Sequence, residues 1–271
     1  MVRCRQAVEL NTNTERHTTL PTTTLPTTGE FRHAVRAHIY ACVAHFKALG
    51  VNEWDVVNEA CASSVANGSF FKPNFWYPKV PDYVDVAFRA AHEAAAGTGT
   101  QLFYNDFGAE QMGAEKSETV YAMVKSMIDR KVPIDGVGLQ MHVKTKPNPK
   151  YPHEKVTPPD EAKVSANIAR LGKLGLKVHI TEMDVSCPDP CGPAELEQQA
   201  EIYASMLRAC LANPGVCTSF ESWGFTDAVT WLTGERCATK SCHPLPFDEQ
   251  YTPKPAALAM LKVLQEHAAG L

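Results

Sequence analysis

The sequence predicts an α/β protein built on parallel strands, and three observations support this class. From about residue 30 onward, short apolar segments alternate with amphipathic segments of helical length. The short segments are almost continuously apolar, as expected of strands that are buried on both faces of a parallel sheet. Each of them ends in polar or aromatic residues, and the carboxyl ends of parallel strands form the ligand-binding edge in such folds.

The composition is that of a globular chain long enough for one large domain. The chain has 271 residues, of which 44% are hydrophobic and 21% are charged, and its net charge is −4. It has no basic run and no stretch near the ~20 apolar residues of a membrane span, so we expect neither a nucleic-acid nor a membrane partner. No apolar core of an export signal is visible near Met1.

The chain divides into two segments of different character. Residues 1–30 are rich in threonine and proline and are expected to form an irregular arm. Residues 31–271 carry the regular alternation and are expected to form the folded domain. An apolar stripe of helical period from Phe31 to Leu49 indicates the first helix of this domain, and Gly50 ends it.

Five strands, each followed by a helix, are expected after this first helix. The strands are expected in "WDVVNEA", "QLFYNDFGA", "DGVGLQMHV", "KVHITEMDV" and "SFESWGFTD", residues 54–60, 101–109, 135–143, 177–185 and 219–227. The helices are expected at residues 82–97, 116–132, 158–175, 194–213 and 254–269. A loop rich in aromatic residues and proline is expected at residues 67–81.

The ends of the expected strands collect side chains that can act on a substrate. These side chains are Asn58 and Glu59, then Tyr104, Asn105 and Asp106, then Gln140 and His142, then Glu182 and Asp184, and finally Trp223 and Asp227. Hydrolysis of a glycosidic bond needs two carboxyl groups in one cleft. One of them protonates the leaving oxygen, while the other attacks the anomeric carbon or activates a water molecule. Glu59 and Glu182 are the candidates for these roles.

Neighbouring residues fit the same interpretation. Asn58 can hydrogen-bond a sugar hydroxyl while the adjacent acid faces the bond to be broken. His142 can orient Glu182 and keep it ionised. Asp184 lies two residues after Glu182, on the same face of the strand, and can polarise a histidine.

The aromatic residues and histidines narrow the chemistry further. Trp223 and Trp231 offer flat surfaces on which sugar rings can stack. The ten histidines include no HExxH motif, and no His/Cys cluster has zinc spacing. We therefore expect no catalytic metal and no other cofactor.

Six of the nine cysteines form three pairs that are close in sequence. The pairs are Cys187 with Cys191, Cys210 with Cys217, and Cys237 with Cys242. Short loops closed by two cysteines favour disulfides in an oxidising compartment, and ordinary buried thiols are the alternative. No partner is evident for Cys4, Cys42 or Cys61.

Several of these segments resemble the glycoside hydrolase family 10 endo-1,4-β-xylanases. The matching runs are "WDVVNEA", "LFYNDFGAE", "PIDGVGLQMHV", "HITEMDV" and "SWGFTDAVTWL", in the order and near the spacing of the family. The likeness covers about residues 31–268. It implies a (β/α)8 barrel that hydrolyses xylan with retention of configuration. The family and the cysteines together favour an extracellular, secreted protein, and we expect a monomer.

The resemblance also implies roles for individual residues. Glu59 matches the acid/base residue of the family and Glu182 its nucleophile. Asn58 matches the residue that binds the sugar 2-hydroxyl. Gln140 and His142 match residues around the nucleophile, and Asp184 matches the partner of that histidine. Tyr104 and Asn105 lie on the motif of the fifth strand, and Trp223 and Trp231 match aromatic residues that wall the glycone side. Cys210 and Cys217 resemble a disulfide of fungal members.

The sequence departs from the family at its N-terminal end. Three strands precede the Asn-Glu strand in a complete barrel, whereas only 53 residues precede Trp54. The first two βα units are therefore expected to be missing, with "RHTTLPTTTLP" as an altered remnant of the third. A barrel that lacks these units has two open edges, so we expect the chain to be unstable or to aggregate, and its activity to be low.

Two alternatives to a xylanase remain open. Another β-1,4-glycanase of the same barrel clan, such as a cellulase or a mannanase, uses the same pair of carboxyl groups. A truncated fragment or a carbohydrate-binding pseudoenzyme retains the sugar-facing residues without productive turnover. The residues themselves predict a two-glutamate glycosidase, whereas xylan as the substrate follows from the resemblance alone.

Overall fold

The structure, a computed structural model, describes residues 6–7, 27–66, 68–148, 150–153 and 155–270. The chain forms two compact units. The first unit comprises Met1–Asp106 and Glu118–Gly138, and the second comprises Phe107–Ser117 and Leu139–Leu271.

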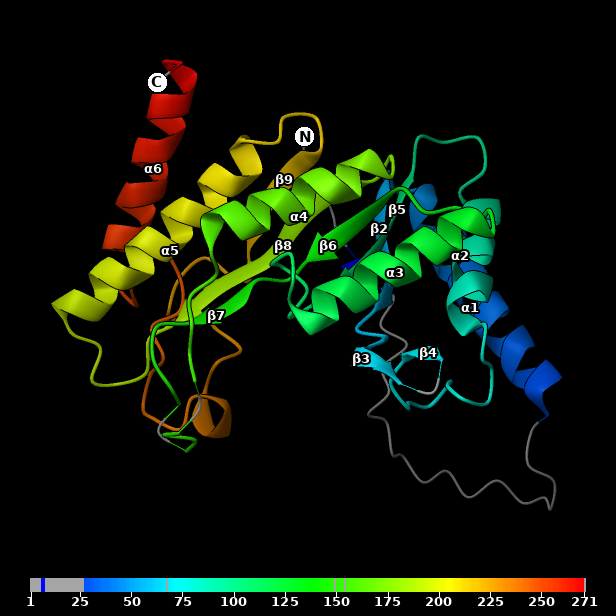
Figure 1. Cartoon of the computed structure of the whole chain (residues 1–271), viewed down its shortest axis with the longest axis horizontal. Coiled ribbons are helices and arrows are strands. Elements are labelled where there is room, and N and C mark those ends of the chain that lie inside the picture. Colours follow the sequence, from blue (N-terminus) through cyan, green and yellow to red (C-terminus); the bar gives the residue numbers. More distant parts are fainter. Residues whose placement is uncertain (1–5, 8–26, 67, 149, 154, 271) are drawn as a thin grey trace. The chain divides into compact units, whose positions relative to one another are not determined.

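The first unit is built on parallel strands (Figure 1). Its elements are β1 (Gln6–Ala7), α1 (Thr28–Lys47), β2 (Glu53–Asn58), β3 (Cys61–Ala66), β4 (Ser69–Phe71), α2 (Tyr83–Ala94), β5 (Gln101–Asp106), most of α3 (Glu115–Asp129) and most of β6 (Gly136–Leu139). β2 pairs in parallel with β1 and β5, and β6 follows β5 in the sheet. α2 packs against β2, β5 and α1. β3 and β4 form an antiparallel hairpin.

The second unit has β8 at its centre. Its elements are β7 (His142–Lys144), α4 (Glu161–Lys173), β8 (Lys177–Ser186), α5 (Pro193–Leu211), β9 (Cys217–Ser222), a short 3-10 helix (Gly234–Arg236) and α6 (Pro255–Ala268). β8 is parallel to both β7 and β9. α5 lies between α4 and α6 and packs against both (Figure 1).

Local sequence explains where α1 begins. The hydroxyl of Thr27 accepts a hydrogen bond from the backbone N–H of Glu30, and the Glu30 carboxylate accepts one from the backbone N–H of Thr27 at 2.7 Å. This capping box satisfies two N–H groups that a helix start otherwise leaves without partners. Val35, Ile39 and Val43 then recur every four residues and are buried. The helix therefore begins slightly earlier than the apolar stripe predicts.

All five predicted strands and all six predicted helices are present, which confirms the α/β class with parallel strands. The strand predicted over residues 135–143 is instead two strands, β6 and β7. Met141 interrupts it because its φ of 66° lies in the left-handed region, which a continuous strand does not adopt. The β3–β4 hairpin was not predicted, and β4 falls within the predicted loop 67–81.

The predicted irregular arm, residues 1–30, lies mostly outside the described residues. Within it, Gln6–Ala7 forms β1, paired in parallel with Trp54 and Asp55 of β2. α1 also begins inside this segment, at Thr28.

Burial in the second unit is uneven. β8 is buried along almost its whole length, whereas β9 is only half-buried. Three leucines of α6 are exposed, namely Leu258 at 57%, Leu261 at 51% and Leu264 at 47%. Their spacing of three residues places an apolar stripe on the outer face of this helix. Among the described residues, no helix has the length and hydropathy needed to cross a membrane.

Each of the three predicted cysteine pairs is a disulfide. They are Cys187–Cys191, Cys210–Cys217 and Cys237–Cys242, and all lie in the second unit. Cys42 and Cys61 remain thiols, and Cys4 lies outside the described residues. The alternative of six ordinary buried thiols is therefore wrong.

Candidate active-site residues

Glu59 lies immediately after β2, in the first unit. Its φ of 56° turns the chain out of the strand, and its backbone N–H donates to the carbonyl of Asn105 at 2.9 Å. A non-glycine residue in the left-handed region is strained, and such strain is most common at functional sites. The side chain is 38% exposed, and its Oε2 lies 3.9 Å from Nζ of Lys72. The turn thus presents an accessible carboxylate beside an ammonium group.

The two predicted amides of the first unit contact each other. Asn58 and Asn105 are paired in the β2–β5 register, and Nδ2 of Asn105 donates to Oδ1 of Asn58 at 3.0 Å. Asn105 is buried and Asn58 is half-buried. This bond orients the Asn58 amide beside Glu59.

Tyr104 is fully buried rather than presented to solvent. Its hydroxyl donates to Oδ2 of Asp106 at 2.5 Å and accepts from the backbone N–H of Cys61 at 2.9 Å. Burial, reinforced by the charge of Asp106, raises the pKa of this hydroxyl well above its usual value. Tyr104 therefore holds the chain two residues after Glu59, which favours a positioning role over the direct substrate contact that the sequence predicted.

Glu182 lies in the second unit, in the carboxyl-terminal half of β8, and His142 holds it. Nε2 of His142 is 3.2 Å from Oε2 of Glu182, and Nδ1 is 2.9 Å from Oδ2 of Asp184. The β7–β8 pairing places His142 directly opposite Asp184. The imidazole thus bridges two carboxylates, as the sequence predicted.

The two carboxylates determine the charge of His142. Burial disfavours the imidazolium, but hydrogen bonds to Asp184 and Glu182 outweigh it and raise the pKa of His142 to about 10. At neutral pH both ring nitrogens therefore carry protons and donate. Glu182 accepts a charge-assisted hydrogen bond, which is stronger than one from a neutral donor.

Trp231 completes this group of the second unit. Its Nε1 donates to Oδ2 of Asp184 at 2.7 Å, and its ring lies 5.0 Å from the imidazole of His142. The guanidinium of Arg236 also lies over the indole ring, 4.8 Å from its centroid. Trp231 is thus fixed by one hydrogen bond and two ring contacts.

The other predicted residues of the second unit differ in exposure. Gln140 is buried, and its carbonyl accepts from the backbone N–H of Glu182 at 3.1 Å. Trp223 is 47% exposed, and its backbone N–H donates to the carbonyl of Met183 at 3.0 Å. The indole of Trp223 is therefore available for stacking, whereas Gln140 fixes the backbone at Glu182.

Three contacts were not predicted from the sequence. They are the approach of Lys72 to Glu59, the hydrogen bond from the Met141 backbone to the Glu110 carboxylate at 3.2 Å, and a buried ion pair between Asp227 and Lys254 at 2.9 Å. Lys72 lies in a loop without a local motif, and Glu110 ends the run "LFYNDFGAE", which gives no sign of its partner. Asp227 was recognised as a strand-end residue, but nothing in the sequence connects it with Lys254.

Comparisons with known proteins show which family the chain resembles. The family model described as "Glycosyl hydrolase family 10" matches residues 11–263. Endo-1,4-beta-xylanase B of Neocallimastix patriciarum is 37% identical over 238 residues, which cover 88% of this chain and 25% of that protein. Endo-1,4-beta-xylanase B of Thermotoga neapolitana is 34% identical over 239 residues, which cover 88% of this chain and 63% of that protein.

Solved structures that resemble this chain are also named as xylanases. Native xylanase 10B from Thermotoga maritima superposes with a TM-score of 0.78 at 35% identity, covering 92% of this chain and 70% of that chain. Xylanase 10B from Thermotoga petrophila RKU-1 in complex with xylobiose superposes with a TM-score of 0.77 at 36% identity, covering 90% of this chain and 68% of that chain. The chain therefore spans about two thirds of the length of these solved relatives.

Proposed function

Because the chain belongs to glycosyl hydrolase family 10, we propose that it hydrolyses β-1,4-xylosidic linkages within xylan and retains the anomeric configuration. The observation that carries the proposal is the arrangement of Glu182, His142 and Asp184, in which a charged imidazole holds a carboxylate in the carboxyl-terminal half of β8. Membership also gives the fold class, a (β/α)8 barrel, with which the parallel strands and packed helices agree.

The names of the relatives support xylan as the substrate. The two curated relatives are endo-1,4-beta-xylanases, and one solved relative is in complex with xylobiose. Xylobiose is two xylose units, so short xylo-oligosaccharides are the probes we choose for this chain.

The proposed mechanism uses two glutamates, one as the nucleophile and one as the acid and base. Glu182 attacks the anomeric carbon, and the bond to the leaving oxygen breaks as Glu59 protonates that oxygen. Glu59 then removes a proton from a water molecule, which attacks the same carbon and releases Glu182. Two displacements at one carbon restore the original configuration. This mechanism requires the two carboxyl groups to be about 5–5.5 Å apart when substrate is bound.

The surrounding residues have supporting roles in this proposal. Asn58, oriented by Asn105, binds a hydroxyl of the sugar next to the cleaved bond. Trp231 and the exposed Trp223 provide surfaces for sugar rings. The buried residues act indirectly in this proposal. Tyr104 and Gln140 fix the backbone, and Asp184 fixes the histidine, so none of the three is assigned a contact with the sugar.

The test is hydrolysis of soluble xylan and of an aryl β-xylobioside by the purified chain and its variants. Glu182→Ala is expected to abolish turnover of both substrates, because the nucleophile is lost. Glu59→Ala is expected to lower turnover of xylan by far more than turnover of the aryl glycoside, whose leaving group needs little protonation. Glu249→Ala is the matched control, because Glu249 is an exposed carboxylate of the second unit.

The configuration of the first product gives an independent readout. NMR of early hydrolysis products is expected to show the β-anomer before mutarotation. An α-anomer as the first product would refute retention, and equal losses on both substrates for Glu59→Ala would refute its acid role. Turnover of cellulose or mannan in place of xylan would point to another β-1,4-glycanase.

The second candidate function is carbohydrate binding without turnover, and it is favoured by the share of its relatives' length that the chain spans. The chain spans 63% of the Thermotoga neapolitana relative and 70% of the Thermotoga maritima chain. A folded chain that binds xylobiose in calorimetry but does not turn over the aryl glycoside would establish a carbohydrate-binding fragment or pseudoenzyme.

Location and assembly are also proposals. The three disulfides support an extracellular location, because such bonds persist in oxidising compartments. We propose a monomer, which light scattering of the purified chain tests.

A further inference from the structure

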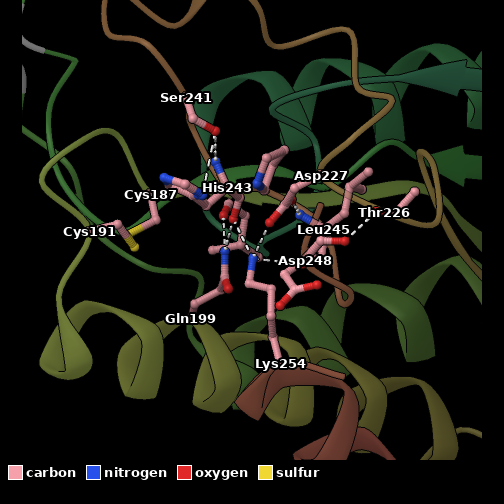
Figure 2. A network of polar contacts seen from close by, with 12 residues as sticks. Cys187, Cys191, Gln199, Thr226, Asp227, Ser241, His243, Leu245, Asp248 and Lys254 are labelled. Atoms are coloured by element: carbon pink, nitrogen blue, oxygen red, sulfur yellow. Dashed lines mark hydrogen bonds and ion pairs between the residues drawn. A yellow bond between two sulfur atoms is a disulfide. The ribbon is translucent and has the colours of Figure 1, made fainter. Parts of the chain in front are cut away.

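Lys254, directly before α6, is a buried lysine whose ammonium has three protein partners. Nζ donates to Oδ2 of Asp227 at 2.9 Å, to the carbonyl of His243 at 2.7 Å and to the carbonyl of Leu245 at 2.8 Å (Figure 2). The side chain is 7% exposed and that of Asp227 is 1% exposed. All three N–H donors of the ammonium are therefore used inside the protein.

Asp227 has two further hydrogen bonds, one to its carboxylate and one from its backbone N–H. Its Oδ1 accepts from the backbone N–H of Leu245 at 2.8 Å, and its own N–H donates to the carbonyl of Phe247 at 2.9 Å. Burial raises the pKa of Asp227, against the opposing effect of the Lys254 charge, and burial lowers the pKa of Lys254. The pair thus fixes the chain after β9 to residues 243–247.

Gln199 of α5 makes a second connection to the same segment. Its Nε2 donates to the carbonyl of His243 at 2.6 Å and to the carbonyl of Val185 at 2.7 Å (Figure 2). Its Oε1 is buried and has no hydrogen-bond partner among the described residues. An unsatisfied buried acceptor is costly, and the two hydrogen bonds from Nε2 offset that cost only while the amide joins both carbonyls.

These two connections reach the same carboxylate by different routes. Val185, bound by Gln199, directly follows Asp184. Asp227, bound by Lys254, lies four residues before Trp231, whose indole donates to Asp184. The carbonyl of His243 accepts from both Lys254 and Gln199 and joins the two routes.

We propose that Lys254 and Gln199 are positioning residues that fix Asp184 and Trp231, and through them the bridging imidazole of His142 and the carboxylate of Glu182. The catalytic part of this inference rests on the proposed function, since Glu182 is assigned there as the nucleophile. The structural part does not, because the geometry at His142 can be measured without substrate.

A contribution to stability alone does not account for this arrangement. A buried ion pair is often no more stabilising than well-packed apolar residues of the same volume, because removing both charges from water is costly. The ammonium, however, specifies a single geometry, since it must meet one carboxylate and two carbonyls at once. Nucleophile positions are sensitive to such geometry, and a displacement of about 1 Å can lower a rate about a hundredfold.

Three variants test the proposal. Lys254→Met removes the donors but leaves the Asp227 carboxylate buried without its partner, so it is also expected to lose stability. The double variant Asp227→Asn/Lys254→Met removes both charges and is expected to recover most of that stability. Gln199→Met preserves the volume and removes the second connection. Lys262→Met is the matched control on α6, because Lys262 is 76% exposed.

The readouts are the pKa of His142 from an NMR titration of its imidazole, the melting temperature, and kcat and KM on an aryl β-xylobioside. In the double variant and in Gln199→Met, we expect the pKa of His142 to fall by about one unit or more, because its bonds to the two carboxylates loosen. We expect kcat to fall at least about tenfold, with a smaller change in KM. Lys262→Met should change none of these values.

The proposal is overturned if the folded double variant and folded Gln199→Met titrate at His142 as the wild type does. It is also overturned if the double variant regains the wild-type pKa of His142 together with its melting temperature, because the pair would then be structural only. If the wild type does not turn over the aryl glycoside, the proposed function fails. The His142 titration still decides the positioning role in that case.

Discussion

Replacement of His142 by glutamine tests how the two carboxylates of the second unit are held together. The native imidazolium lies between Glu182 and Asp184, and its side chain is 21% exposed. The pKa of His142 rises from 6.5 to about 10 because hydrogen bonds to the two carboxylates overcome the effect of burial. Since each pKa unit corresponds to 1.36 kcal/mol, the charged form stabilises the native state by roughly 5 kcal/mol.

The direction of the pH dependence follows from the raised value. The native state binds the proton more tightly than the unfolded state, so the contribution is complete below about pH 6.5. Between about pH 6.5 and pH 10 only the native state keeps the proton, and the free energy of unfolding falls by about 1.4 kcal/mol per pH unit. Above about pH 10 the contribution is lost.

Urea unfolding of the wild type and of His142→Gln between pH 6 and pH 10.5 measures this contribution. The difference between the two proteins isolates His142 and the two carboxylates that it contacts, because more distant titrating groups affect both curves alike. We expect the wild type to be several kcal/mol more stable at pH 6 and the two proteins to converge near pH 10. A difference that stays constant across this range, or an imidazole that titrates near pH 6.5 by NMR, would refute the reasoning.

Three further outcomes are expected. Tyr104→Phe should lower the free energy of unfolding by about 2 kcal/mol in urea titrations, because Asp106 and the Cys61 N–H both lose a buried partner; an unchanged value would contradict the positioning role. Lys72→Met should change that free energy by less than about 0.5 kcal/mol, because its pair with Glu59 is well exposed, while lowering turnover of xylan. The third change replaces the exposed leucines of α6 by glutamine, at Leu258, Leu261 and Leu264. It should raise the concentration at which the chain aggregates in light scattering without lowering its melting temperature.

Periodicity predicted the elements that are long and buried. β8 is recognisable because "KVHITEMDV" is a short run between two segments of helical length, and its two carboxylates, Glu182 and Asp184, fall in its carboxyl-terminal half. The short pair β3 and β4 was missed because "CASSVA" and "SFF" lack the alternation of a half-buried strand, although Asn67-Gly68 between them in the sequence is a typical two-residue turn motif. β1, with two residues, is too short for any pattern to detect.

Contacts at the candidate site were predictable only where one strand register determines them. Glu182 and Asp184 share a strand face, and His142 ends the neighbouring apolar run, so their approach follows from the strand arrangement. The pair of Asp227 and Lys254 joins residues that are 27 positions apart across a segment with little regular structure. No local pattern encodes such a contact, because it depends on how the loop after β9 folds back.

The two proposed catalytic carboxyl groups have different environments, and this difference supports the division of their roles. Glu182 is 11% exposed and fixed by a cationic donor 3.2 Å away, which suits a group that must remain a carboxylate and attack one atom. Glu59 is 38% exposed and lies 3.9 Å from the ammonium of Lys72, and this access to solvent suits a group that must release a proton and later take one from water. Retaining hydrolysis needs this asymmetry, because a pair of equally held carboxylates would supply no acid for the first step.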